Sequence, residues 1–133
     1  MHSTPEQAPS ILEDVVFVIF IFNQAHYLKN AIGSAINQTQ FPAKLIIMDD
    51  ASTDGSEDVV ANILINTPTG LNIKYVRNER NVGLISQINR VVKENPSKLI
   101  VVQAGDDESY PERLEVTHKE WLDGGKPPLI LAN

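Results

Sequence analysis

The chain has 133 residues, of which 42% are hydrophobic and 21% charged, and it carries a net charge of −6 with no cysteine. This length and composition are typical of one folded domain rather than of a disordered chain. The acidic balance argues against nucleic acid as a partner, and the lack of cysteine excludes disulfides and zinc–cysteine sites.

Residues 1–12 begin with a polar stretch that contains proline, so we expect a flexible N-terminal tail ahead of one domain over residues 13–133. The longest apolar run, Val15–Phe22, has eight residues. A membrane-spanning helix needs roughly 20 apolar residues. We therefore expect no membrane-spanning segment in this chain.

Apolar strand-like segments alternate with segments of helical periodicity along the chain. Val15–Phe22 is continuously apolar and predicts a buried strand. Apolar residues recur at helical spacing from Leu28 to Ile36, and Asn23 is a candidate N-cap for that helix. Leu45–Met48 predicts a second strand, and Val60–Leu64 marks a second helix.

The same alternation continues in the second half of the chain. Leu71–Arg77 predicts a third strand, Leu84–Val92 a third helix and Leu99–Val102 a fourth strand. A fourth helix is expected through Leu114–Leu122, and Leu129–Leu131 predicts a fifth strand. Because the sequence stops within that strand, we expect it to be the N-terminal part of a longer protein.

Two sequences have the spacing of a capping box, in which a side chain at the helix start bonds a main-chain amide three residues later. Asp54 with Glu57 predicts the start of the second helix, and Ser109 with Glu112 predicts the start of the fourth.

This alternation predicts an α/β fold with a mainly parallel sheet and helices on both faces. Ligands of such sheets bind beyond the carboxyl ends of the strands. There the chain places Asp49-Asp50 after the second strand, Asp106-Asp107 after the fourth, and Phe22, which could stack on a flat ring, after the first. Like charges that converge need a compensating cation or donor, and Mg²⁺ or Mn²⁺ bound with a phosphate meets that need.

A purely structural interpretation of the acids, as helix caps and turn formers, accounts fully for Asp54, Ser56 and Ser109. It accounts less well for two acidic pairs that directly follow buried strands. The sequence lacks the phosphate-binding loop, the dinucleotide fingerprint and the nucleophile elbow, so no function that depends on those motifs is indicated.

Several motifs, in this order, resemble the N-terminal half of family 2 glycosyltransferases with the GT-A fold, and the resemblance covers about residues 13–123. It implies a Rossmann-like domain of which this chain holds the nucleotide-sugar-binding part. The residues that carry it are Asn23; Ser34 and Gln38; Asp49, Asp50, Ser52 and Asp54; Asn81 and Gly83; and Asp106 and Asp107.

The resemblance implies an enzyme that transfers a sugar from a nucleotide-diphosphate donor, most naturally a UDP-sugar, to an acceptor hydroxyl with inversion. By position, Phe22 would stack on the base and Asp50 would accept a hydrogen bond from it. Asp106 would contact the ribose or the metal, and Asp107 would hold Mn²⁺ or Mg²⁺. Arg80 is the candidate for contact with the diphosphate.

The chain departs from the family pattern in two places: Phe20-Ile21 stands where the family has Pro-Thr, and Ala104 replaces the first acid of the metal motif. The family's general base lies downstream of that motif, so we expect it beyond residue 133 and expect little transfer by residues 1–133 alone. The implied acceptor is a glycan or glycolipid in bacterial polysaccharide assembly, in the cytoplasm or at the inner face of the membrane.

Three other functions remain open at this point. A receiver domain also has an acidic pair after a parallel strand, but its phosphate-accepting Asp and its Lys have no counterpart at the expected strand ends. A nucleotidyltransferase also joins a metal and a nucleotide, but the first strand is not followed by the basic, glycine-rich loop of that class. The third is an inactive relative that serves as a nucleotide-binding or scaffold domain, and Phe20-Ile21 and Ala104 keep this alternative open.

Overall fold

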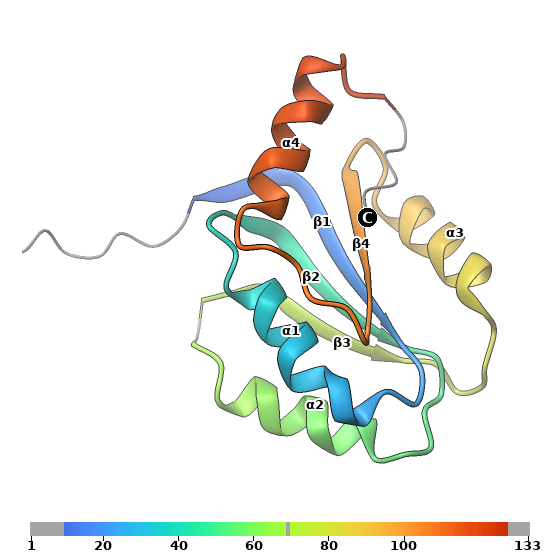
Figure 1. Cartoon of the computed structure of the whole chain (residues 1–133). Helices are drawn as coiled ribbons and strands as arrows, with labels where there is room; N and C mark the ends of the chain where they lie inside the picture. The colour runs from blue at the N-terminus through green and yellow to red at the C-terminus, as the bar shows by residue number, and fades with distance from the viewer. Residues whose placement is uncertain (1–9, 69, 128–133) are drawn as a thin grey trace, which may run out of the picture.

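The computed structural model describes residues 10–68 and 70–127, in which strands and helices alternate as the sequence predicts (Figure 1). The predicted strand at Leu129–Leu131 and residues 1–9 of the predicted tail lie outside the described residues. The elements are β1 (Ile11–Ile21), η1 (Ala25–Tyr27), α1 (Leu28–Ile36), β2 (Phe41–Asp49), α2 (Ser56–Ile65), β3 (Ile73–Arg77), α3 (Leu84–Glu94), β4 (Leu99–Ala104) and α4 (Arg113–Asp123).

The first strand begins earlier than predicted. Ile11 and Leu12, which we assigned to the tail, belong to β1 and pair with the start of β2. The Leu12 side chain is buried in the core, and the Phe41 amide donates a hydrogen bond to the Ser10 carbonyl. Two acids, Glu13 and Asp14, lie between these residues and the apolar run that we used to place the strand, and the β1–β2 register shifts between Leu12 and Val16.

The four strands form a parallel sheet in the order β3-β2-β1-β4. The register places Ile21 of β1 opposite Asp49 of β2, and Phe20 of β1 opposite Ala104 of β4. The chain therefore leaves three adjacent strands at one edge of the sheet. Receiver domains have the order 2-1-3-4-5, so the receiver alternative is wrong.

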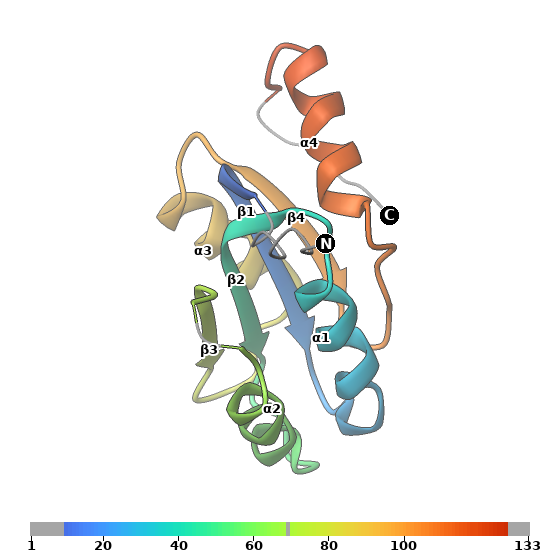
Figure 2. The same ribbon diagram turned by 90° about the vertical axis from the view of Figure 1, so that its left-hand side faces the viewer.

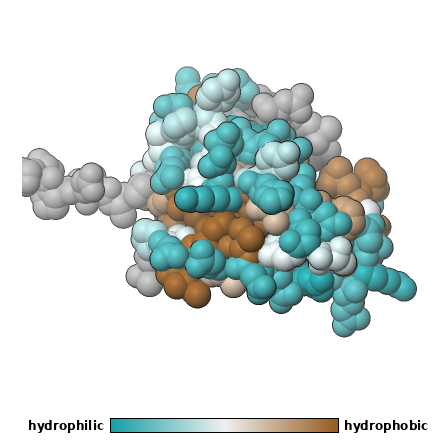
Figure 3. Space-filling model, turned by 60° about the horizontal axis from the view of Figure 1, so that its bottom comes forward, coloured by the Kyte–Doolittle hydropathy of each residue, from teal (hydrophilic) through white to brown (hydrophobic). Residues whose placement is uncertain are grey.

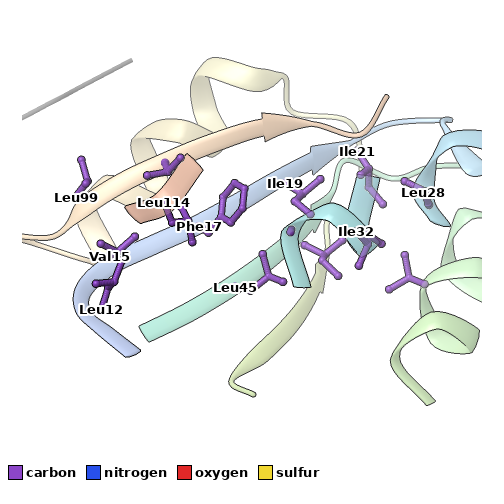
Figure 4. Close-up of a cluster of buried hydrophobic side chains, with 14 of the residues drawn as sticks. Leu12, Val15, Phe17, Ile19, Ile21, Leu28, Ile32, Leu45, Leu99 and Leu114 are labelled. Atoms are coloured by element: carbon purple, nitrogen blue, oxygen red, sulfur yellow. The ribbon is translucent and has the colours of Figure 1, made fainter. Parts of the chain in front are cut away.

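Helices cover both faces of the sheet, as predicted. Alternate residues of a strand point to opposite faces, and the side chains of Val15, Phe17, Ile19 and Ile21 enter one core cluster with α1, α2 and α4 (Figure 4). The side chains of Val16, Val18 and Phe20 enter a second cluster against α3, on the other side of the sheet (Figure 2). None of the described helices is long and apolar enough to cross a membrane.

The predicted helix caps are wrong. Helix α2 begins at Ser56 with Gly55 as its N-cap, and α4 begins at Arg113 with Glu112 as its N-cap. Asp54 lies one residue before Gly55, and its Oδ1 accepts a hydrogen bond from the Ser56 amide at 3.1 Å, whereas the Glu112 side chain makes no capping hydrogen bond. Asn23 does not cap α1 either, because a short 3₁₀ helix, η1, precedes it.

Candidate functional site

A cavity of about 1310 Å³ opens at the carboxyl edge of the sheet and extends between α3 and α4. Phe22 after β1, Asp50 after β2 and Asp107 after β4 all line it. Three of the residues predicted for a nucleotide site are therefore brought together, and the acids that follow β2 and β4 share one cavity as expected. Figure 3 turns this lower side of Figure 1 toward the viewer and shows a mostly hydrophilic surface with separate hydrophobic areas.

Asp50 is an ionised acceptor held by main-chain and side-chain donors from the segment after β3. Its Oδ1 accepts hydrogen bonds from the Val82 amide at 2.9 Å and from Asn78 Nδ2 at 3.0 Å. Its Oδ2 accepts one from the Gly83 amide at 2.9 Å. Burial by itself would raise the pKa of Asp50, but these hydrogen bonds together outweigh burial and lower it below the ordinary value.

Asp49, the other acid of this pair, is fully buried and has a structural role. Its Oδ1 accepts hydrogen bonds from the amide and the hydroxyl of Ser52, at 2.9 and 2.6 Å. Its Oδ2 accepts one from the Tyr75 hydroxyl, at 2.5 Å. Burial and the adjacent carboxylate raise the pKa of Tyr75, so this hydroxyl remains a donor. Of the two acids, only Asp50 lines the cavity.

The loops after β1 and β2 are joined by three hydrogen bonds. The Asn23 amide donates to Ser52 Oγ at 2.9 Å, and Asn23 Oδ1 accepts from the Thr53 amide at 2.7 Å. Asp54 Oδ2 accepts from the Ala25 amide at 2.9 Å. Asn23 takes a positive φ of 51°, which an asparagine adopts more readily than most residues. The polar residues of this motif therefore fix the loops that carry Phe22 and Asp50.

Asp107 and Asp106 differ in their relation to the cavity. Both are exposed, but only Asp107 lines it. Within residues 10–68 and 70–127, the Asp107 carboxylate has no hydrogen bond or ion pair. The Asp107 carboxylate is thus available to a ligand in the cavity. Asp106, for which we predicted contact with the ribose or the metal, does not line the cavity.

The basic residue at the cavity is not the one that we predicted. Arg80 is exposed and does not line the cavity. Arg113, at the start of α4, is the one basic side chain among the described residues that line it. Its guanidinium donates to Ser109 Oγ and to the Val102 carbonyl, at 3.0 and 2.8 Å, and lies over the Phe17 ring. Burial lowers the pKa of Arg113, and the charge of Asp107 opposes that effect.

The Gln24 side chain lies between Phe22 and Gly105 at the end of the sheet. The Phe22 side chain is 46% exposed, which leaves a ring face available to a planar ligand. Gln24 Oε1 accepts a hydrogen bond from the Phe22 amide at 3.1 Å. A Cβ atom on Gly105 would lie 2.5 Å from Gln24 Oε1 and 2.7 Å from Ile21 Cγ2, so glycine is required where these segments approach.

The described residues do not form a complete set of metal ligands. No three His, Asp or Glu side chains come together among them in a way that could hold a cation. Mg²⁺ commonly binds through one or two carboxylates and completes its coordination with phosphate oxygens and water. The available Asp107 carboxylate fits that kind of site, in which the ligand brings part of the coordination shell.

Comparison with known proteins connects this geometry to a family. The profile of glycosyl transferase family 2 matches residues 16–126. EpsE of Bacillus subtilis (strain 168), which carries a glycosyltransferase assignment, is 32% identical over 101 residues, 76% of this chain and 36% of EpsE. The chondroitin synthase of Pasteurella multocida (strain Pm70) is 29% identical over 76% of this chain and 10% of its own length. This chain thus spans about a third of EpsE and a tenth of the synthase.

Solved structures show the same fold. The Pyrobaculum calidifontis mannosyltransferase PcManGT, in complex with GDP-Man and Mn²⁺, superposes with a TM-score of 0.70 at 18% identity, over 86% of this chain and 34% of the mannosyltransferase. Residues 1–349 of S. aureus TarS, in complex with UDP-GlcNAc, superpose with a TM-score of 0.66 at 22% identity, over 83% of this chain and 31% of TarS 1–349. The arrangement of β3-β2-β1-β4 is therefore that of the GT-A fold.

Proposed function

Because this chain belongs to glycosyl transferase family 2, we propose that it binds the nucleotide-sugar donor of a glycosyl transfer, most naturally a UDP-sugar, in the cavity lined by Phe22, Asp50 and Asp107. In the reaction, an acceptor hydroxyl oxygen forms a bond to the anomeric carbon while the bond from that carbon to the diphosphate breaks, with inversion. The nucleoside diphosphate leaves with the bonding electrons, and the hydroxyl proton passes to a general base. None of the residues named here is assigned as that base.

The observation that carries the proposal is the convergence of an aromatic ring, an ionised acceptor and an available carboxylate on one cavity. Phe22, Asp50 and Asp107 come from the ends of three adjacent parallel strands, where α/β sheets bind nucleotides. A second cavity, beside Ala35, Leu45 and Ile73, holds only about 10 Å³. This arrangement favours binding of a nucleotide over a purely structural role for the acids.

Asp50 favours a base that presents an N–H group. Its lowered pKa keeps the carboxylate ionised at neutral pH, so it can only accept hydrogen bonds. Its Oδ2 has one hydrogen bond from the protein, which leaves room for another donor. Uracil and guanine each offer a ring N–H, whereas adenine and cytosine offer a ring acceptor there. We therefore expect UDP and GDP to bind better than ADP and CDP.

Asp107 is the residue that we assign to the metal, with Asp106 beside it in the chain. A divalent cation at this position would neutralise the diphosphate and stabilise the charge that develops as the nucleotide leaves. The bound Mn²⁺ and GDP-Man of the structurally similar mannosyltransferase support this assignment. The Asp107 carboxylate is fit to serve because no described side chain occupies it.

The acceptor that we propose is the hydroxyl of a glycan or glycolipid in bacterial polysaccharide assembly. The location that we propose for the reaction is the cytoplasm or the inner face of the membrane. Two bacterial relatives support this class of acceptor, since they are named as a chondroitin synthase and a hyaluronan synthase. Each of these relatives is about ten times the length that this chain matches.

Calorimetric titration of the chain with UDP, with and without Mn²⁺, tests the proposal. We expect Mn²⁺ to tighten UDP binding and Asp107→Ala to abolish that gain, because the variant lacks the carboxylate ligand. Asp123→Ala removes an exposed acid that does not line the cavity and should behave as wild type. Equal binding with and without Mn²⁺, or equal loss in both variants, would show that the metal assignment is wrong.

A further inference from the structure

The loop that carries Asp107, residues 105–112, is anchored by the C-terminal end of α1. Gln38 follows that helix and is 3% exposed. Its Nε2 donates to the Tyr110 carbonyl at 2.7 Å and to the Ser34 carbonyl at 3.0 Å. Its Oε1 accepts from the Leu114 amide at 3.0 Å. One buried carboxamide thus joins the end of α1, the loop and the first turn of α4.

The main chain of the loop is bound at the two residues next to Tyr110 as well. The Ser109 amide donates to Ser34 Oγ at 3.0 Å. The Pro111 carbonyl accepts from the Thr39 amide at 2.8 Å. Three successive residues of the loop are therefore held by Ser34, Gln38 and Thr39, which lie more than 70 residues away in sequence.

The connection reaches Asp107 itself through Gln103 of β4, which is also buried. Gln103 Nε2 donates to the Asp107 carbonyl at 3.1 Å and to the Ala31 carbonyl of α1 at 3.0 Å. Gln103 Oε1 accepts a hydrogen bond from the Ser109 hydroxyl. Asp107 is thus tied to α1 through its main chain, while its carboxylate remains available to a ligand.

From these contacts we propose that Gln38 is a positioning residue for Asp107, and that it acts through the loop without touching the ligand. The proposal rests on the proposed function, because it presumes that Asp107 holds a cation. Loss of the Gln38 carboxamide would leave the buried amide of Leu114 without its partner, and the Tyr110 carbonyl would keep only the hydrogen bond from the Arg113 amide. Residues 105–112 would then be less well fixed, and the Asp107 carboxylate would no longer be held in position for a cation. Asp50 shares none of these contacts.

The test compares UDP binding with and without Mn²⁺ in wild type and Gln38→Leu. We expect Gln38→Leu to bind UDP alone as wild type does and to lose about 10- to 100-fold of the Mn²⁺-dependent gain, as for other residues that orient metal ligands. Amide hydrogen exchange should rise across residues 105–112 in the same variant, without any ligand present. An unchanged Mn²⁺-dependent gain would overturn the proposal.

Two control variants separate positioning from general loss of stability. Val60→Ala creates a cavity in the core under α2, away from the loop, and should keep the full Mn²⁺-dependent gain. Thr39→Ala keeps the main-chain bond to Pro111 and should also keep that gain. If Val60→Ala loses as much of the gain as Gln38→Leu, the proposal is wrong. A wild-type chain without any Mn²⁺-dependent gain would contradict the proposed function itself.

A milder variant covers the case in which Gln38→Leu does not fold. Ser34→Ala removes the acceptor of the Ser109 amide and a hydrogen bond to the Ala31 carbonyl within α1, and leaves the Gln38 contacts in place. We expect it to lower the Mn²⁺-dependent gain by a smaller factor and to raise exchange at Ser109. Wild-type exchange and wild-type gain in Ser34→Ala would overturn the proposal as well.

Discussion

At the scale of single residues, removal of the exposed Phe22 ring should weaken nucleotide binding without lowering the stability of the fold. Stacking of a base on an aromatic ring contributes about 1–3 kcal/mol per base, so Phe22→Ala should weaken UDP binding roughly ten- to hundredfold. Because the side chain is nearly half-exposed, the free energy of unfolding should change little. Calorimetry and urea unfolding measure the two effects.

Tyr27→Ala is the matched control for Phe22→Ala. Tyr27 is another exposed aromatic residue of the same segment, but it does not line the cavity. Its removal should leave UDP affinity within about twofold of wild type, since no stacking energy is lost. Equal losses in both variants would mean that Phe22 is not the stacking residue.

The carboxylates of Asp50 and Asp54 predict how stability depends on pH. The pKa of Asp54 is lowered, chiefly by the Ser56 hydroxyl, and that of Asp50 is lowered because three hydrogen bonds outweigh its burial. An unfolded Asp has a pKa of about 3.9, so below about pH 5 the unfolded chain binds more protons than the native one. Their stabilisation is thus complete above that pH and is lost as the pH falls through the native pKa values.

Urea unfolding between pH 3 and pH 7, followed through the single tryptophan, Trp121, checks this expectation. The midpoint should fall with acidification, and Asp50→Asn should make the fall shallower because one of the two groups no longer titrates. The same slope in wild type and Asp50→Asn would contradict the role given to Asp50.

At the scale of elements, two glycines should respond in opposite ways to alanine. Gly105 has no room for a Cβ atom, so Gly105→Ala must displace both Gln24 and Ile21 or shift the start of the loop that carries Asp107. We expect lower stability and a smaller Mn²⁺-dependent gain in UDP binding. Gly33 lies inside α1 with nothing within 4 Å of the added atom, so Gly33→Ala should stabilise the chain by about 0.5–1 kcal/mol. Urea unfolding of both variants measures the contrast, and a stabilised Gly105→Ala would contradict it.

The order and type of the elements could be predicted from sequence because periodicity and burial are local properties. The helix starts could not be predicted to the residue, because the candidate cap residues also bond to distant segments. Asp54 accepts from Ala25 in the loop after β1, and Ser109 donates to Gln103 of β4. Asn23 likewise bonds the loop after β2 instead of capping α1. Such contacts exist only once the strands have been placed side by side.

At the scale of the whole molecule, stability depends on the larger of the two core clusters. Ile47 of β2 is fully buried in it, so Ile47→Ala should cost about 2–5 kcal/mol of unfolding free energy. Ile65 at the end of α2 is 81% exposed, so Ile65→Ala should change the free energy of unfolding by no more than about 0.5 kcal/mol. Urea unfolding of both variants measures the difference, and similar costs would contradict the assigned core.

The convergence of two acidic pairs on one edge could be predicted, because a parallel sheet brings the carboxyl ends of its strands together. Which member of each pair faces the cavity did not follow from the sequence pattern, and the family resemblance alone pointed to Asp50 and Asp107. Asp50 lines the cavity where Asp49 does not, and Asp107 lines it where Asp106 does not. We did not predict Arg113 at the cavity, because the place of its side chain depends on where α4 begins, and the sequence did not show that start.

The hydrogen bonds that join the loops after β1 and β2 have a consequence for protein engineering. Asn23 and Asp54 each span both loops, so neither loop can be replaced without removing partners from the other. A chimera designed to accept a different nucleotide would have to transplant the two segments as a matched pair. If only one loop were replaced, the hydrogen-bonding groups of the other loop would lose their partners.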